Sequence, residues 1–426
     1  MFRMFSFEAP KGRSLSEIWQ DNAKNIRNLI SFWLFGLANN FGYVIMLSAA
    51  FDILRNIENK HEENKDFKRL CNEMSTGVIL LASIIPSFCV KIVVPFLPLW
   101  IHARMIIVVT TYTAGLLLVA QGSYHVLIIT GVCFVSFAAG LGESSLIAYT
   151  VFFNTRNVLS TWASGTGAAG LFGSFSYSLM IQLGLTPNLA IMSMLVMPLL
   201  MAVCFWFILN RPSLERFQRK LKFLNEKGTL INLSKVELQA YETFTFRDKL
   251  NLVPHLLIRF TLFYGLVYLF EYFINQGLFE LLQFPKTFLT IPQQYRWYNF
   301  MYQLGVFISR SSMNIVNIDY IWLLALLQAC NVFIFMFEVT LGIFKYLEII
   351  LALIIWEGLL GGAAYVNTFR LIAVEMPDYQ REFALSLNAI GDSVMITLAG
   401  IIAIPVHNAI CYMESPYGPL NFTVQA

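Results

Sequence analysis

Charged side chains inside long apolar stretches are the residues of this sequence best placed to do chemistry. Glu271 is followed four residues later by Asn275, which would share its face of a helix. Tyr272 and Gln276 form the adjacent stripe. A carboxyl group in a water-poor site can carry a proton when that site is exposed first to one side and then to the other. We therefore expect Glu271 to handle a proton or a substrate, the alternative being a structural ion pair.

One cation and several other polar residues occupy similar positions. Lys91 lies between two prolines, where it could neutralise an anionic cargo or pair with a Glu. Asn39 and Asn40 could line a cavity, or they could hold helices together by hydrogen bonds. The remaining candidates for a substrate or proton pathway are Glu143, Glu357 and Asn367.

The composition indicates that these residues are held within a membrane. Of the 426 residues, 57% are hydrophobic and only 13% are charged, and the mean hydropathy is +0.63. A soluble domain carries roughly 25% charged residues. The apolar residues also gather in long runs, which predicts a polytopic membrane protein embedded in the lipid bilayer. The small net charge of +3 is spread over loops, so no nucleic-acid partner is expected.

Eleven stretches have about the 20 residues that a helix needs to cross a bilayer. We predict an all-α protein, because strands would have to alternate and close into a barrel. The stretch at 295–312 is the least apolar of the set. Arg310 at its end is expected to reach the headgroups unless it pairs with Asp319. The eleven predicted spans are 28–50, 75–98, 104–121, 125–150, 161–184, 188–209, 257–281, 295–312, 319–340, 344–368 and 383–407.

The distribution of Lys and Arg predicts the orientation of the chain. These residues are more frequent in the segments that are cytosolic when the N-terminus is cytosolic. Eleven spans then place the C-terminus on the luminal side. The expected organisation is a cytosolic tail 1–27, a six-helix half 28–210, a cytosolic loop 211–252, a five-helix half 253–410 and a luminal tail 411–426.

Two features favour a transporter built from two related halves. A long polar loop after the sixth span is typical of such proteins. The two halves also show a weak internal sequence repeat, because the first and seventh spans both carry paired amides, in GLANNFGYVIML and FEYFINQGLFELL. The fourth and tenth spans both combine glycines with a Glu, in AAGLGESSLIAYT and WEGLLGGAAYVNT.

The glycines at Gly165, Gly167 and Gly170 spell the dinucleotide-binding pattern G-x-G-x-x-G. That site requires a preceding strand and a later acidic residue. The glycines instead lie inside an apolar span, and residues 183–199 contain no Asp or Glu. We interpret Gly167, Gly170 and Gly173, together with Ala163, as a nearly smooth helix face along which another helix can pack closely.

Sequence motifs give no support to an enzyme. The chain lacks H-E-x-x-H, G-x-S-x-G and a Walker motif, so neither metal-dependent hydrolysis nor use of ATP is expected. Asp392 lacks the G-x-G-D context of an intramembrane aspartyl protease. We predict no enzymatic activity and no cofactor.

Several long motifs resemble the battenin family of lysosomal membrane proteins. The resemblance extends over most of 28–410 and implies a major-facilitator-like fold in a late endosomal or lysosomal membrane. It further implies clearance of small solutes from the lumen, with glycerophosphodiesters as cargo and, less directly, basic amino acids such as arginine, together with a link to lysosomal pH. The motifs are GLANNFGYVIMLSAAFDIL (36–54), ASGTGAAGLFGSFSY (163–177), EYFINQGLFELL (271–282), QQYRWYNFMYQLGVFISRSS (293–312) and EGLLGGAAYVNTF (357–369).

The C-terminal residues depart from part of this family. Some members look prenylated at a C-a-a-X box, whereas the last cysteine here is Cys411, so prenylation is not expected. Cys71 and Cys411 would share the luminal side, where a disulfide between them is chemically allowed. Asn421 begins an N-F-T sequon, which predicts glycosylation on that side.

The loop after the sixth span resembles an acidic dileucine sorting signal. Glu226 lies four residues before the pair Leu230 and Ile231. Adaptor proteins read such segments on lysosomal membrane proteins, so sorting adaptors are expected partners. The alternative is an amphipathic patch lying on the membrane.

Two classes of function remain open from the sequence. The first is a solute transporter whose partners are a small-molecule solute and, as coupling ions, protons. The second is a non-transporting membrane protein that organises lysosomal trafficking or acidity through its cytosolic loop. A transporter needs a polar cavity at mid-membrane, and a scaffold does not.

Overall fold

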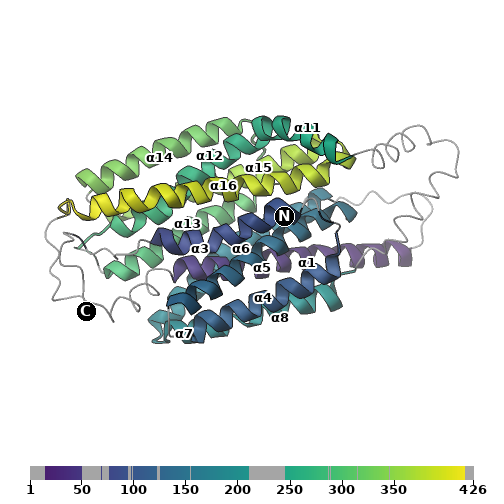
Figure 1. Cartoon of the computed structure of the whole chain (residues 1–426), viewed down its shortest axis with the longest axis horizontal. Coiled ribbons are helices and arrows are strands. Elements are labelled where there is room, and N and C mark those ends of the chain that lie inside the picture. Colours follow the sequence, from purple (N-terminus) through teal and green to yellow (C-terminus); the bar gives the residue numbers. More distant parts are fainter. Residues whose placement is uncertain are drawn as a thin grey trace.

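The structure is a computed structural model, and it forms an elongated bundle of long helices (Figure 1). Within the described part of the chain there is no strand, which confirms the all-α prediction. The structure describes residues 15–49, 69, 76–94, 97, 99–121, 125–153, 155–210, 245–285, 287, 289–313, 315–344 and 346–417.

In the N-terminal half, the residues that the structure describes form six helical segments, which match the first six predicted spans. The last of them is interrupted, and it ends in a π-helical turn. The elements are α1 (Leu15–Ser48), α3 (Thr76–Val93), α4 (Ile101–Gln121), α5 (His125–Tyr149), η2 (Thr150–Phe152), α6 (Thr155–Gln182), α7 (Pro187–Ser193), α8 (Val196–Val203) and η3 (Cys204–Ile208).

The described residues of the C-terminal half form five helical segments, the first of which is a composite of α-, π- and 3-10 turns. It begins at Phe246, inside the segment 211–252 that the sequence assigns to a loop. Thr245 and Asp248 form a capping box that fixes this start. The elements are α11 (Phe246–Leu256), η4 (Leu257–Thr261), α12 (Leu262–Phe273), η5 (Ile274–Leu278), η6 (Phe279–Leu281), α13 (Ile291–Arg310), α14 (Ile321–Leu341), α15 (Leu347–Glu375) and α16 (Asp378–Cys411).

Eight helical stretches of the described chain are long and apolar enough to cross a membrane, and 79–93 forms a shorter apolar helix. Helices α6 and α13 cover the two remaining predicted spans but are too polar for that criterion. Their polarity has a structural reason, because both helices lie where the two halves meet. Helix α13 buries Gln294, Arg296 and Asn299, whose polar groups face protein and not lipid.

The two halves repeat the same packing scheme. In the N-terminal half the first helix, α1, packs along the fifth, α6, and the second, α3, packs along the fourth, α5. In the C-terminal half α12 packs along α16, and α13 packs along α15, which are the equivalent pairs. The halves meet where α3 contacts α16 and where α6 contacts α13 (Figure 1). This is the arrangement expected for a major-facilitator-like protein.

Glycines allow helices to approach one another at the backbone. A Cβ atom on Gly165 would lie 2.1 Å from the carbonyl oxygen of Trp33 in α1. A Cβ atom on Gly167 would lie 3.0 Å from the Cα atom of Phe307 in α13. The predicted packing face of α6 is confirmed at Gly167, which lies against α13, whereas Gly165, outside that predicted face, packs against α1.

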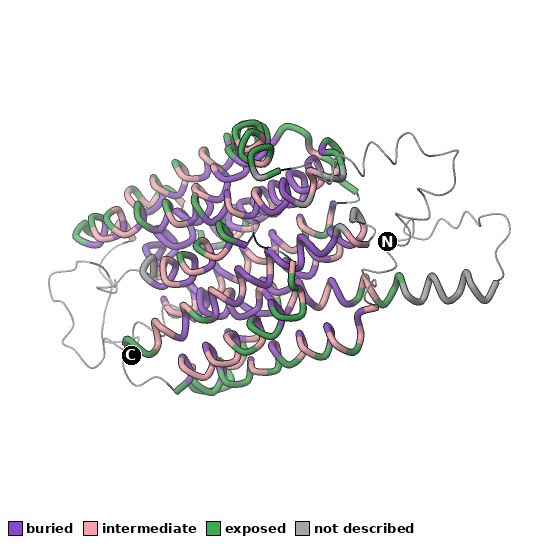
Figure 2. Tube along the Cα trace, turned by 45° about the vertical axis from the view of Figure 1, so that its right-hand side comes forward, coloured by how far each residue is buried: buried purple, intermediate pink, exposed green. Residues whose placement is uncertain are grey.

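Burial follows the pattern of a membrane bundle. Figure 2 shows buried residues along the inner sides of the helices and exposed residues on the outer sides. Large apolar side chains such as Phe207 and Phe333 are exposed on the outer surface, at 77% and 64%. In a bilayer these side chains contact lipid, whereas in water they would be an unfavourable surface.

Candidate functional site

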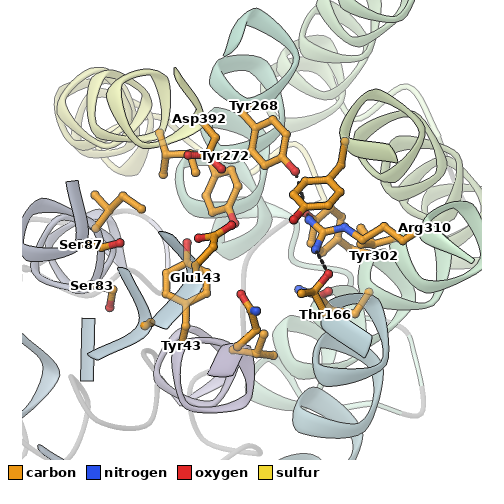
Figure 3. A pocket seen from close by; sticks show the side chains of 18 of the residues that line it. Tyr43, Ser83, Ser87, Glu143, Thr166, Tyr268, Tyr272, Tyr302, Arg310 and Asp392 are labelled. Carbon is orange, nitrogen blue, oxygen red and sulfur yellow. Dashed lines mark hydrogen bonds between the residues drawn. The ribbon is translucent and has the colours of Figure 1, made fainter. Parts of the chain in front are cut away.

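A polar cavity of about 80 Å³ lies between the two halves (Figure 3). It draws side chains from α1, α3, α5 and α6 on one side and from α12, α13, α15 and α16 on the other. A volume of this size holds several water molecules. The polar side chains that line it are Asn40, Tyr43, Ser83, Ser87, Lys91, Glu143, Thr166, Tyr268, Tyr272, Tyr302, Gln303, Arg310, Tyr365 and Asp392.

Lys91 is the centre of an ion-pair cluster that joins three helices. Its Nζ atom lies 2.7 Å from Oε2 of Glu143 and 3.4 Å from Oδ1 of Asp392. It also donates a hydrogen bond of 3.1 Å to the Ser393 hydroxyl. The Tyr264 hydroxyl donates to the other carboxylate oxygen of Asp392 at 3.2 Å. One cation is thus shared by two carboxylates, so the cluster does not carry an excess of positive charge.

Arg310 faces the cavity from the end of α13. Its Nη1 donates a 2.8 Å hydrogen bond to Oγ1 of Thr166, and its Nη2 donates a 3.1 Å hydrogen bond to the Tyr268 hydroxyl. The guanidinium lies over the ring of Tyr365, 4.2 Å from its centroid. The sequence-based expectation that Arg310 reaches the headgroups or pairs with Asp319 was wrong. Arg370 pairs with Asp319 instead.

The helical register of α13 contains a signal that would have located Arg310. Tyr302, Val306 and Arg310 are four residues apart, and Gln303 lies seven before Arg310. All four side chains line the cavity, so they mark one face of the helix. Sequence reasoning ranked Arg310 by its distance from the end of the span, and it therefore missed that face. It also missed the tyrosines Tyr43, Tyr268, Tyr302 and Tyr365 as cavity residues.

Glu271 lies directly behind the wall of the cavity and does not line it. The hydroxyl of Tyr302, a lining residue, donates a hydrogen bond to its Oε1. Its Oε2 has no hydrogen-bond partner and lies against Gly361, where a Cβ atom would come within 2.0 Å. Glu357 is one turn before Gly361 on α15 and is fully buried, and neither of its carboxylate oxygens has a hydrogen-bond partner among the residues that the structure describes.

The other predicted site residues divide into two groups. Asn40 and Tyr272 line the cavity, as do Lys91 and Glu143. The side chain of Asn39 ties α1 to α5 by donating to the carbonyl oxygen of Ala139 at 3.0 Å. Among the further candidates, Asn367 accepts a 2.8 Å hydrogen bond from the backbone N–H of Ile318, and Asn275 and Gln276 are buried in η5 without lining the cavity.

Several predictions concern residues outside the described part of the chain. These are the sorting residues Glu226, Leu230 and Ile231, the sequon at Asn421, and Cys71. Cys411, the predicted partner of Cys71, is disulfide-bonded.

Comparison with known proteins settles the family. The family model described as CLN3 protein matches residues 30–413. This chain belongs to the CLN3, or battenin, family. It is 38% identical to battenin of Canis lupus familiaris, over 91% of this chain and 92% of that protein. It is 33% identical to protein btn-1 of Neurospora crassa, over 91% of this chain and 89% of that protein. The predicted family is confirmed.

Solved structures show the fold of this CLN3-family chain. An auto-inhibited POT family peptide transporter aligns with a TM-score of 0.55 at 14% identity, over 90% of this chain and 89% of that one. The human organic anion transporter MFSD10 (TETRAN) aligns with a TM-score of 0.56 at 12% identity, over 92% of this chain and 96% of that one. At such identities the likeness concerns the fold alone, and it confirms the major-facilitator-like prediction.

Proposed function

We propose that this protein is a solute transporter that exports small soluble products from the lysosomal lumen by alternating access. The observation that carries the proposal is the polar cavity at the boundary between the two halves, lined by Lys91, Glu143, Arg310 and Asp392. In major-facilitator-like proteins the substrate site lies at this boundary. A scaffold protein gains nothing from such a cavity.

The energetics of buried charge support this proposal. A charged side chain near the middle of a bilayer is costly and persists where it lines a water-filled space or pairs with another charge. Here both conditions hold at one place, since Lys91 is paired and Arg310 faces the cavity. The arrangement concentrates polar groups where a solute would be bound.

The two halves are joined near each end of the bundle by hydrogen bonds that can break and re-form as the halves move. Toward one end of the bundle, the hydroxyl oxygens of Ser164 and Ser311 lie 3.1 Å apart. Toward the other end, the Tyr295 hydroxyl donates to the carbonyl oxygen of Leu47 at 3.5 Å. Rocking of one half against the other would break one set of contacts and keep the second, which exposes the cavity to one side at a time.

Glycerophosphodiesters from lipid breakdown are the cargo that we propose, with basic amino acids such as arginine as a second class. The support for these cargoes is family membership, and the cavity adds polar groups of both charges. We propose that protons are the coupling ion and that the link to lysosomal pH follows from this coupling. The hydrogen bond between Tyr302 and Glu271 supports the proton proposal, because it places a buried carboxyl group next to the cavity wall.

A lysosomal membrane location with a cytosolic N-terminus is part of the same proposal. The bias of Lys and Arg supports the orientation. The disulfide at Cys411, at the end of α16, supports a luminal position for that end, because disulfides persist in oxidising compartments. Glycosylation at Asn421 and recognition of the loop 211–252 by sorting adaptors are further parts of the proposal.

Uptake into liposomes tests the function. Purified protein in proteoliposomes should take up labelled glycerophosphoglycerol faster than empty liposomes do, and an imposed pH gradient should change the rate. Labelled arginine is the second probe. Uptake of neither probe above that of empty liposomes, with or without the gradient, would reject the transporter and favour the scaffold.

A further inference from the structure

The charged groups of the cavity are separated into two ends. Figure 3 shows Glu143 and Asp392 on one side and Arg310 on the other, with Tyr268 and Tyr272 between them. Lys91 belongs to the acidic end through its contacts of 2.7 Å and 3.4 Å with the two carboxylates. At one end of the cavity an entering anion therefore meets Lys91, which is already paired with two carboxylates, and at the other end it meets Arg310.

Arg310 has no carboxylate partner among the described residues. Its two hydrogen bonds go to the neutral hydroxyls of Thr166 and Tyr268. Its Nε atom is buried and has no hydrogen-bond partner in the described part of the chain. The carboxylates of Glu143 and Glu271 act on this guanidinium only from beyond ion-pair distance. A ligand that brings an oxyanion into direct contact with the buried guanidinium therefore gains electrostatic energy.

The surroundings fix the plane of the guanidinium. The ring of Tyr365 lies under it, and the Tyr365 hydroxyl accepts a 3.2 Å hydrogen bond from Nε1 of the buried Trp162. A guanidinium held in one plane presents a fixed fork of N–H donors. This fork matches the two oxygens of a phosphodiester or a carboxylate, which it can bind in a bidentate manner.

We propose that Arg310 is the anion-binding residue of the cavity and that it receives the phosphodiester or carboxylate group of the cargo. This inference rests on the proposed transport function. The tyrosine hydroxyls around the guanidinium, those of Tyr268 and Tyr302, are placed to bond hydroxyl groups on the remainder of the cargo. The ligand class is a small polar solute with one oxyanion. Lys91, which the sequence favoured for this role, holds the two halves together instead.

The test measures binding to purified full-length protein. The probes are glycerophosphoglycerol as a phosphodiester, arginine as a carboxylate, and inositol as a neutral polyol of similar polarity. Arg310→Gln should weaken binding of the oxyanion that the wild-type protein binds by about tenfold or more, because charge-assisted hydrogen bonds are lost. Arg310→Lys keeps the charge but loses the fork, and its loss should be smaller. Affinity for inositol should not fall in either variant.

The matched control is Arg259→Gln, which removes an arginine from a solvent-exposed pair with Glu375. Its affinities should equal those of the wild-type protein. Unchanged oxyanion affinity in folded Arg310→Gln would overturn the assignment. If Arg310→Gln does not fold, Arg310→Lys is the deciding variant. Unchanged oxyanion affinity of Arg310→Lys would overturn bidentate binding by the guanidinium, and a loss of about threefold or more supports it. The oxyanion that loses affinity identifies the chemical class.

The inference and the proposed function fail differently. If the wild-type protein transports its solute and Arg310→Gln binds that solute normally, the transport function stands and Arg310 is excluded as the anion-binding residue. A wild-type protein that carries neither oxyanion in liposomes rejects the function itself.

Discussion

Lys91 of α3 and Asp392 of α16 come from different halves of the protein, and their charged atoms lie 3.4 Å apart beside the cavity. The same ammonium group lies 2.7 Å from Glu143, which belongs to the half of Lys91. A cation held more closely by its own half can release the carboxylate of the other half without becoming unpaired. The pair between Lys91 and Asp392 is therefore suited to open when the halves move.

Loss of Lys91 should destabilise the fold. Lys91→Met leaves Glu143 and Asp392 close together without their cation, and breaking a buried pair in this way costs about 3–5 kcal/mol. The melting temperature of the detergent-solubilised variant should fall clearly. Arg259→Met, which breaks an exposed pair, should change the free energy of unfolding by only about 1 kcal/mol or less. A Lys91→Met protein as stable as that control would contradict the structural role.

Glu271→Gln should preserve the fold and slow transport. The amide oxygen of Gln can still accept the hydrogen bond from Tyr302, so packing around it is retained. The amide cannot carry a proton, and uptake driven by a pH gradient should fall by about tenfold, equivalent to about 1.4 kcal/mol. Uptake is measured as a function of pH. A normal rate with an unchanged pH profile would exclude Glu271 from the proton pathway.

Gly165→Ala should destabilise the N-terminal half. Its methyl group would lie 2.1 Å from the backbone oxygen of Trp33, and relief of that overlap requires α1 and α6 to separate, at about 1–3 kcal/mol. Gly173→Ala is the matched variant on the same helix, because its nearest neighbour is a side-chain atom of Val44 at 3.2 Å. Thermal unfolding should rank Gly165→Ala below Gly173→Ala. Equal stability of the two would show that the close approach at Gly165 is not required.

Replacement of Leu230 and Ile231 by Ala should move the protein from lysosomes to the cell surface. An adaptor needs one acidic group, supplied by Glu226, and two apolar side chains, and the double variant removes the latter. Quantitative imaging against a lysosomal marker measures the shift. Phe217 and Leu221 lie four residues apart just upstream, the spacing of an amphipathic helix, and their replacement by Ala is the control for a patch that lies on the membrane. Unchanged lysosomal location of the Leu230 and Ile231 variant would reject the signal at this position.

The fold could be predicted from the sequence because each membrane span is a continuous, largely apolar stretch of about the length that crosses a bilayer. The length of the apolar stretches predicted the positions of the helices. The spacing of Gly167, Gly170 and Gly173 predicted that another helix packs closely on α6, but not which helix. The polar character of α13 weakened its prediction as a span, yet the same polarity reflects its place between the halves. In a membrane protein a less apolar stretch can thus be a helix in the interior of the bundle, and its polarity is not evidence against a membrane span.

The site could be predicted only in part, because its geometry depends on which residues face one another. Lys91 and Glu143 were found as charges in apolar stretches, but their separation of 2.7 Å depends on how α3 packs against α5. Arg310 was missed because the depth of a side chain in the bundle does not follow from its distance to the end of a span. Asn367 was selected for its position in a span, whereas its Oδ1 accepts a hydrogen bond from the backbone N–H of Ile318 in the segment before α14.

A reversible lock between the halves gives the most direct test of alternating access at the cavity. The hydroxyl oxygens of Ser164 and Ser311 lie 3.1 Å apart, so cysteines at both positions are placed to form a disulfide across the halves. The measurement is uptake of labelled glycerophosphoglycerol into proteoliposomes that hold the double variant Ser164→Cys/Ser311→Cys, with Ser164→Cys alone as the control. We predict uptake by the reduced double variant, loss of uptake on oxidation and recovery with a reductant, while the control is unaffected. Equal uptake by the cross-linked and reduced protein, or no uptake above empty liposomes in any state, would contradict the account.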